Sequence, residues 1–341
     1  MLRNPGVFEV RGYSRSLSSP VQFFTRSLQG RDHPGPRHVS LLHGFHLRGV
    51  TIGGENGTVD GGGPFWWHRH LSKTETHTRG HLFECMNCTD LLFQDVTFQN
   101  SPFWTVHPVF SRRVTARRLT VLNDWHSPNT DGFDPDSTSD VVLEDSFFST
   151  GDDGVAIKSG WDCYGVAVGV PSRNITIRNL TVLSPTSAGV CIGSEMSGGV
   201  SEVSVTDSTF IHCSTGIRVK SGRKRGGYVR NISYRDINIA GPLSAAILVD
   251  AFYGGDPAGC PAVQHYAPPQ ISNLSFANIR ATDCVGSFMQ LRGLSDAPTT
   301  LLSVHNVSFT GSKGYTCTGG VHGHYRNMKP IPPAVCGLTP L

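Results

Sequence analysis

A nine-residue pattern of polar and apolar positions recurs along most of the chain. A copy usually begins with Asn or Asp, alternates apolar and variable positions, has Asp or Asn again at its sixth position, and then resumes the alternation. Alternation with a period of two is typical of β-strands, and the central polar residue indicates a sharp bend between two of them. The first apolar position of each copy is Leu91, Val114, Val141, Ile175, Val203, Ile232, Leu274 and Val307.

Repeats of this kind indicate a solenoid, in which each copy is one coil and neighbouring coils bury a shared core. Successive copies are 23 to 42 residues apart and show no helical periodicity. Leucine-rich repeats have a similar period, but their Leu-x-x-Leu-x-Leu signature is absent. We therefore predict an all-β, single-stranded right-handed parallel β-helix over residues 38–341. Residues 1–37 show no period and are expected to form a poorly defined N-terminal segment.

Each coil continues into a second, shorter strand, and the unusual polar residues lie on or just before it. These second strands are expected at residues 103–107, 132–134, 154–158, 189–193, 216–220 and 246–250. Residues at the same phase of consecutive coils become neighbours about 4.8 Å apart. Asp131 and Asp153 both immediately precede a Gly that marks the phase, so we expect them one coil apart on one face.

Acidic residues concentrate around these two positions, although only 16% of the chain is charged. Two carboxylates on one face suit the cleavage of a glycosidic bond, because one can protonate the leaving oxygen while the other activates water. Like charges this close cannot all ionise, so one pKa should be raised. The spacing is equally compatible with Asx turns or with ligands for Ca²⁺.

Arg218 and Lys220 favour the catalytic interpretation. Residues two apart in a strand project from the same face, and these two are predicted to lie two coils beyond Asp153. The pair suits an anionic substrate, since Arg can grip a carboxylate in bidentate fashion. The alternative is that both side chains only neutralise the acidic cluster.

Together these segments resemble the polygalacturonases, glycoside hydrolase family 28, of the plant and bacterial branch. The similarity extends over roughly residues 38–320. It implies hydrolysis of α-1,4-galacturonosyl linkages in pectin, with no metal and no organic cofactor. The segments that match the family's NTD, DD and RIK motifs, in the same order, are Asn129-Thr130-Asp131, Gly151-Asp152-Asp153 and Arg218-Val219-Lys220.

The resemblance also implies a role for each of these residues. Asp152 would be the general acid, Asp131 and Asp153 would position the attacking water, and the anomeric carbon would be inverted. Arg218 and Lys220 would bind a galacturonate carboxylate at the cleavage site.

Other parts of the resemblance are less definite. Asn129 belongs to the motif without a settled role, and residues 100–108 and 192–199 look like the branch that includes exo-acting members. Many members have Gly-His-Gly where this chain reads Ser187-Ala188-Gly189, and we expect the missing His to tune efficiency or specificity. Inverting glycosidases usually hold their carboxylates about 6.5 to 9.5 Å apart, which is more than adjacent coils suggest. We therefore expect the side chains to splay apart.

Further residues have two interpretations each. Trp104 and His107 are predicted one coil before Asp131, where an aromatic ring could stack on a sugar, but a structural pair fits the pattern as well. Glu195 is expected to orient its neighbours without acting chemically. The run Arg223–Arg225 could draw a polyanion towards the site, or could be only a solvated surface.

Composition excludes several classes of protein. The net charge is +3, the isoelectric point is near 8.4, and no basic run is longer than three residues, so a nucleic-acid surface is not indicated. No apolar run approaches the roughly 20 residues of a membrane-spanning helix. Nine Cys leave at least one unpaired within the chain, and Cys85-x-x-Cys88 lacks the second pair that a metal site would need. We expect a monomer whose partner is an anionic polysaccharide.

The family is secreted or found in the cell wall, yet residues 1–30 have no apolar core suited to a signal peptide. We expect a truncated or wrongly assigned start, in preference to an organelle transit segment. Asn-x-Ser/Thr sequons suit a secretory protein, but most share one repeat phase, so structure explains them equally well. They begin at Asn56, Asn87, Asn174, Asn179, Asn231, Asn273 and Asn306.

The sequence is also compatible with three functions other than that of a polygalacturonase. The chain could hydrolyse a related pectin, such as rhamnogalacturonan or xylogalacturonan. It could be a calcium-dependent pectate lyase, which would share the architecture and the anionic substrate. It could also be a non-catalytic β-helix protein that binds pectin. The choice between endo and exo action is left open as well.

Overall fold

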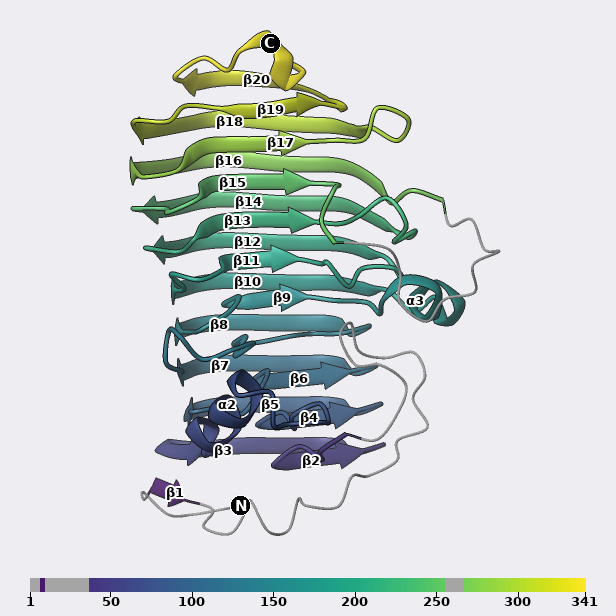
Figure 1. The fold of residues 1–341 in the computed structure, drawn as a ribbon, viewed down its shortest axis with the longest axis vertical. Helices are drawn as coiled ribbons and strands as arrows, with labels where there is room; N and C mark the ends of the chain where they lie inside the picture. The colour runs from purple at the N-terminus through teal and green to yellow at the C-terminus, as the bar shows by residue number, and fades with distance from the viewer. Residues whose placement is uncertain (1–6, 10–36, 255–266) are drawn as a thin grey trace.

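Parallel strands stacked coil upon coil make up most of the structure, a computed structural model in which residues 7–9, 37–254 and 267–341 are described (Figure 1). Neighbouring long strands pair in parallel and in register. The long strands of the described ranges form one sheet: β1 (Val7–Glu9), β3 (Arg48–Asp60), β5 (Thr89–Gln99), β7 (Arg112–Leu122), β8 (Ser139–Ser149), β10 (Ser172–Leu183), β12 (Val200–Ile211), β14 (Tyr228–Ala240), β16 (Gln270–Cys284), β18 (Thr299–Gly311), β20 (Val321–Lys329) and β21 (Leu338–Pro340).

The second strands form two shorter parallel sheets. One contains β2 (Leu42–Phe45), β4 (Phe83–Met86) and β6 (Val106–Val109). The other contains β9 (Val155–Ile157), β11 (Ala188–Ile192), β13 (Thr215–Lys220), β15 (Ala245–Asp250), β17 (Ser287–Arg292) and β19 (Thr316–Gly319). Short helices lie in the loops: α2 (Gly63–Leu71), α3 (Asp162–Val168) and the 3-10 helix Ala334–Cys336.

This alternation of a long and a short parallel strand in each coil is a right-handed parallel β-helix, because parallel strands joined by crossovers are almost always right-handed. The predicted fold is confirmed. Most of the predicted segment 1–37 lies outside the described residues. Within it, β1 pairs in parallel with β3, and the boundary at residues 37 and 38 stays a prediction.

Polar residues bend the long strands where the repeat pattern places them. Asp145, Asn179 and Asp236 lie in the middle of their strands with φ of 51°, 49° and 58°. This left-handed backbone region is disfavoured for most L-residues but tolerated by Asn and Asp. The predicted bend in the middle of each repeat is therefore confirmed.

The bends stack on one another and form side-chain ladders along the sheet. Asn179 donates a hydrogen bond to Asp145 at 2.7 Å, and Asn278 donates one to Asp236 at 2.8 Å. The ladder continues from Asn306 to Asn278. All seven Asn residues of the sequons have positive φ, which supports the structural interpretation of their spacing.

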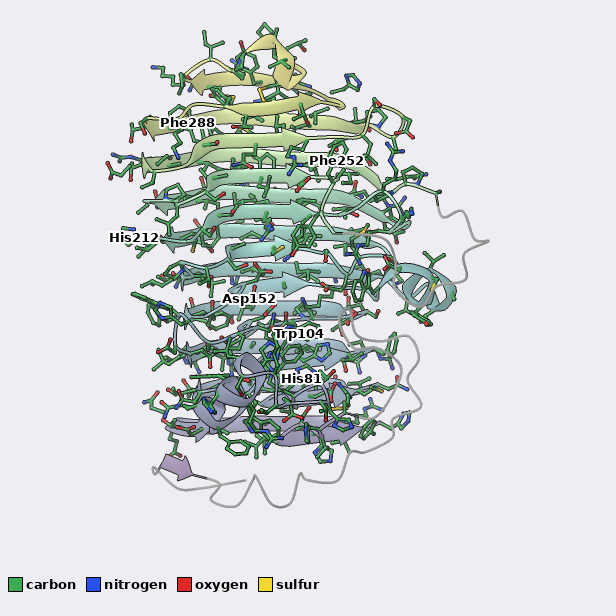
Figure 2. The ribbon with its side chains drawn as sticks, viewed as in Figure 1. His81, Trp104, Asp152, His212, Phe252 and Phe288 are labelled. Carbon is green, nitrogen blue, oxygen red and sulfur yellow. A yellow bond between two sulfur atoms is a disulfide. The ribbon has the colours of Figure 1, made fainter. Side chains whose placement is uncertain are left out.

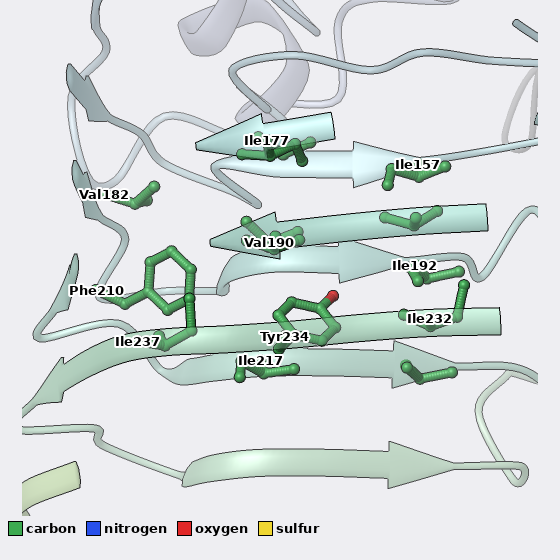
Figure 3. Packing of buried hydrophobic residues seen from close by; sticks show 14 of the residues in the cluster. Ile157, Ile177, Val182, Val190, Ile192, Phe210, Ile217, Ile232, Tyr234 and Ile237 are labelled. Carbon is green, nitrogen blue, oxygen red and sulfur yellow. The ribbon is translucent and has the colours of Figure 1, made fainter. Parts of the chain in front are cut away.

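Alternate positions of the strands point inward and fill a continuous apolar core. Figure 3 shows part of it, where Val190, Ile217 and Tyr234 come from three successive coils. Tyr234 is fully buried, and burial raises the pKa of its phenol. Each coil alone would expose this apolar face, so the coils stabilise one another.

The predicted phase of the last repeat is wrong by half a copy. Val307 pairs with Ile279, the residue that follows a central bend, whereas Leu302 pairs with Leu274. The first bend of this coil is at Leu301, which has a φ of 55°. Since Leu replaces the usual Asn or Asp there, the polar signal for the start of the copy is missing.

The second strands also differ from prediction at two places. The strand expected at residues 103–107 begins only at Val106, so Trp104 lies in the turn before it. The strand expected at 132–134 is reduced to isolated bridges at Phe133 and Asp136.

Cysteine pairing follows no metal-binding pattern. Cys85 and Cys88 form a disulfide, as do Cys317 and Cys336, and Cys163 is also disulfide-bonded. Cys191, Cys213 and Cys284 are free and buried, which confirms that the chain holds unpaired thiols. In the described ranges, no helix has the length and apolar character needed to cross a membrane.

Candidate active site

The shorter sheets place the predicted site residues in rows along the stack. In one row Ala156 pairs with Cys191, which pairs with Arg218. In the neighbouring row Asp136 pairs with Lys158, while Lys220 pairs with Asp250 further along. Arg218 and Lys220 thus lie two coils beyond Asp153, as predicted.

Asp131 and Asp153 occupy equivalent positions in adjacent coils. The residues two positions after them, Phe133 and Val155, pair directly, and the amide of Gly132 donates to the carbonyl of Asp153 at 3.0 Å. One carboxylate oxygen from each of Asp131, Asp152 and Asp153 lies within 4.8 Å of the others. The predicted adjacency is confirmed, and at their nearest oxygens the side chains do not splay beyond 4.8 Å. This distance is shorter than the separation of about 6.5 to 9.5 Å that is usual between the carboxyl groups of inverting enzymes.

Asp153 is buried and fully supplied with hydrogen-bond donors. The ammonium of Lys220 lies 2.8 Å from Oδ2, and Oδ1 accepts from the hydroxyl of Ser187 at 2.5 Å and from the amide of Ala188 at 3.0 Å. Burial opposes ionisation, but Lys220 and Arg218 outweigh it and hold the pKa of Asp153 well below its usual range. Asp153 is therefore an anion throughout the neutral range.

Asp152 is the half-buried member of the three and the one that can reach a substrate. Its Oδ2 accepts from the amide of Asn129 at 3.3 Å, and its Oδ1 accepts from the backbone amide of Asp153 at 2.9 Å. Asn129 is held in turn by Arg79, which donates to its Oδ1 at 2.9 Å. Figure 2 labels Asp152 on the face that carries the shorter strands. Asn129 thus orients Asp152.

Asp131 is buried with only 3% of its surface exposed. Its Oδ1 has no hydrogen-bond partner among the described residues, and its Oδ2 lies 3.6 Å from the ammonium of Lys158. Burial and the neighbouring charge of Asp134 raise the pKa of Asp131 well above its usual value, and Lys158 opposes this. The pKa of one carboxyl in the cluster is therefore raised, as the sequence predicts.

Arg218 and Lys220 share one aromatic neighbour. The guanidinium carbon of Arg218 lies 5.1 Å and the ammonium of Lys220 lies 5.3 Å from the ring centre of Tyr253. Arg218 is half-buried, and its Nε has no hydrogen-bond partner in the described part of the chain. Because its side chain is only half-buried, Arg218 is partly accessible to an anion, whereas Lys220 is already engaged with Asp153.

Trp104 and His107 are almost completely buried, at 2% and 0% exposure. The ring of Trp104 packs against His81 and receives the ammonium of Lys158 at 4.2 Å from its centre. Burial lowers the pKa of His107, but the carboxylates of Asp136 at 3.6 Å and Glu84 at 3.4 Å outweigh burial and raise this pKa. Their rings offer no face to a sugar, which favours the structural interpretation.

Sequence reasoning missed several residues that complete the site. Lys158 and Asp134 belong to the motif-bearing segments, but nothing in their spacing distinguished them from ordinary strand residues. Ser187 was noted only as part of a departure from the family pattern. Arg79 and Tyr253 come from loops, which carry no repeat, so no periodic signal could have placed them near the carboxylates.

The three carboxylates do not fit a calcium site. Their oxygens are close enough to share an ion, and Ca²⁺ takes six to eight oxygen ligands. However, Lys220 is in contact with Asp153 and Lys158 lies beside Asp131. Two buried ammonium groups already balance the charge that a divalent cation would need.

Comparisons with known proteins agree on one family. A sequence profile described as "Glycosyl hydrolases family 28" matches residues 19–325. A protein of Vitis vinifera named "Probable polygalacturonase" is 38% identical over 320 residues, which are 92% of this chain and 63% of that protein. A "Polygalacturonase" of Juniperus ashei is 28% identical over 318 residues, which are 89% of this chain and 58% of that protein. The chain thus spans about three fifths of the length of these plant relatives.

A solved structure supports the fold. The exopolygalacturonase of Thermotoga maritima superposes with a TM-score of 0.78 and 24% identity, over 92% of this chain and 75% of that one. At this level of identity the likeness concerns the fold alone, and it agrees with the right-handed parallel β-helix.

Proposed function

Because the chain belongs to glycosyl hydrolases family 28, we propose that it hydrolyses α-1,4-galacturonosyl linkages of pectin, as a polygalacturonase. The observation that carries this proposal is the cluster of Asp131, Asp152 and Asp153 beside Arg218 and Lys220. Three carboxylates with oxygens within 4.8 Å of one another, next to two cations, suit acid/base chemistry on an anionic sugar.

The environments of the three carboxylates support different roles. Asp152 is half-buried, and its carboxylate accepts hydrogen bonds from an amide side chain and a backbone amide, so it can meet the leaving oxygen and protonate it as general acid. Asp131 and Asp153 are buried on the neighbouring coils, where they can hold the attacking water between them. The water adds a hydroxyl to the anomeric carbon, and its remaining proton passes to the carboxylate that binds it.

Arg218 is the residue best placed to bind a galacturonate carboxylate. Its guanidinium carbon lies 5.1 Å from the ring centre of Tyr253, and its side chain is only half-buried. Lys220 contributes positive charge at the same place while it keeps Asp153 ionised. Ala188 donates its backbone amide to Asp153, so the residue at the site of the missing His still supports the water-positioning carboxylate.

Product analysis on polygalacturonate tests the proposal. New reducing ends without ultraviolet-absorbing unsaturated product, unaffected by a chelator, indicate a hydrolase, whereas an unsaturated product that requires calcium indicates a lyase. Release of monomer alone indicates exo attack. The same assay on rhamnogalacturonan and xylogalacturonan decides between related pectins, and the anomer formed first, measured by NMR, tests inversion.

The same proposal covers location and assembly. We expect the protein to act outside the cell or in the cell wall, where pectin occurs, and to act as a monomer. Fractionation of the cell that makes it and size-exclusion chromatography test these two expectations.

A further inference from the structure

Lys158 lies at the centre of a buried group of charges. The proposed chemistry assigns a role to Asp131 in this group but none to Lys158. Its ammonium is 3.4 Å from Asp134, 3.6 Å from Asp131 and 3.4 Å from Glu195. The side chain is 2% exposed. A buried cation with three carboxylates at salt-bridge distance is costly to assemble unless its charge is needed.

The aromatic ring of Trp104 closes this group on one side. The ammonium lies 4.2 Å from the ring centre, and Trp104 itself is packed against Phe103, His81 and His107. The ring therefore holds Lys158 against the carboxylates and keeps water away. Low water content strengthens the effect of the positive charge on its neighbours.

The remaining charges around Asp131 are negative. Asp134 comes from the same coil, and Asp152 and Asp153 come from the next one. Among the described groups that shift the pKa of Asp131 most, only Lys158 favours its ionised form. Burial raises the pKa of Asp134 to about 7, so this carboxyl takes up a proton more readily than an ordinary Asp.

We propose that Lys158 is a positioning residue whose buried ammonium favours the ionised form of the Asp131 carboxylate and fixes it in place to bind the attacking water. This rests on the proposed function, in which Asp131 takes part in hydrolysis. Trp104 acts through Lys158 by confining it. Glu195 accepts a hydrogen bond from the same ammonium at 3.4 Å and helps to fix its position, which agrees with the orienting role expected from the sequence.

The proposal has a definite consequence for the pH dependence. A base must be ionised to accept a proton, so the acid limb of kcat/KM reports its pKa in the free enzyme. Removing an opposite charge at this distance shifts a carboxyl pKa upward by about 1 to 3 units. K158M should therefore move the acid limb to higher pH by this amount. KM should change little, because Lys158 is buried.

Two comparisons separate this effect from a loss of structure. K158R keeps the charge and should move the acid limb less than K158M, while K313M removes an exposed Lys elsewhere and should not move it. Asp134 raises the pKa of Asp131, so D134N should move the acid limb to lower pH. The double variant K158M/D134N removes one charge of each sign and should bring the limb back towards the wild type.

The inference is overturned if the acid limbs of K158M and the wild type coincide, or if D134N moves the limb upward. Should the wild type cleave no polygalacturonate, the proposed function fails, and thermal unfolding still tests the charge balance. In K158M the uncompensated carboxyls gain pKa in the folded state, so its Tm deficit should widen as pH rises from about 4.5 to 8. A deficit independent of pH would contradict the proposal by itself.

Discussion

Asp131 and Asp153 are one coil apart, both are buried and both face a Lys, yet their pKa values move in opposite directions. Asp153 touches Lys220 at 2.8 Å and accepts two further hydrogen bonds, so its charged form is stabilised. Asp131 is 3.6 Å from Lys158 and shares that ammonium with Asp134 and Glu195, and one of its oxygens has no partner within the described ranges.

The difference teaches that burial alone does not decide the state of a carboxyl. What decides it is the number of donors for each carboxylate and the number of like charges that share a cation. In this site one coil supplies Asp153, which is ionised at neutral pH. The adjacent coil supplies Asp131, whose ionised form is favoured by Lys158. Adjacent coils of a regular repeat can thus carry unlike chemistry.

Removing Lys220 should give the largest effect, because it makes Asp153 resemble an unpaired buried acid. Breaking a buried ion pair by removing one partner costs about 3 to 5 kcal/mol of unfolding free energy. We expect K220M to lose that stability and nearly all activity. Denaturant unfolding and the polygalacturonate assay measure the two effects. Unchanged stability would mean that Lys220 does not hold Asp153.

Replacing Asp134, which shares the ammonium of Lys158 with Asp131, should alter the pH dependence of stability. Its folded pKa, about 7, lies above the unfolded value, so its contribution is fully present below the unfolded pKa and is lost as pH rises through about 7. Between pH 5 and 8 the wild type should lose more Tm than D134N. Parallel curves of Tm against pH for the two proteins would show that the pKa of Asp134 is not raised.

Removing the hydroxyl of Ser187 should deprive the Asp153 carboxylate of one hydrogen-bond donor. Losing a hydrogen bond to a buried charged group costs about 1 to 3 kcal/mol. We expect S187A to remain folded, to lose stability in this range and to have a reduced rate. S184A is a matched control, since Ser184 lies in the same turn and donates to the carbonyl of Asp152 instead. Equal changes in rate for both variants would assign the effect to the turn.

The smallest effect is expected outside the site, at a bend of the long sheet. Asn179 has a φ of 49°, and Ala in a left-handed conformation costs roughly 1 to 2 kcal/mol. N179A should lower stability by about that amount without changing the pH profile. N179G, which adopts the same backbone freely, should lose less. A larger loss in N179G would contradict this account of the bends.

The sequence predicts the regular part of the molecule well because each coil repeats one physical requirement. A polar residue, most often Asn or Asp, marks nearly all the bends, and inward positions are apolar. The bend at Leu301 has no polar residue, and the predicted phase of the last coil is wrong for this reason.

The candidate site is only partly predictable for a related reason. Residues on the short strands or just before them, such as Lys220, Arg218 and Asp153, follow the phase of the repeat and can be placed by counting. The partners of these residues, such as Arg79 and Tyr253, come from irregular loops. Trp104 illustrates the limit, because its phase suggests a sugar platform whereas its burial shows that it packs on Lys158.

The most direct test of the central claim compares the wild type with D152N on polygalacturonate. Asn keeps the shape of Asp152 but cannot protonate the leaving oxygen, and general acid catalysis contributes about 10² to 10⁴ in rate. We predict that the wild type releases reducing ends, and that D152N folds and binds the polymer but loses turnover by that factor. A wild type that binds pectin and never cleaves it, or a D152N variant that cleaves it normally, would contradict the account.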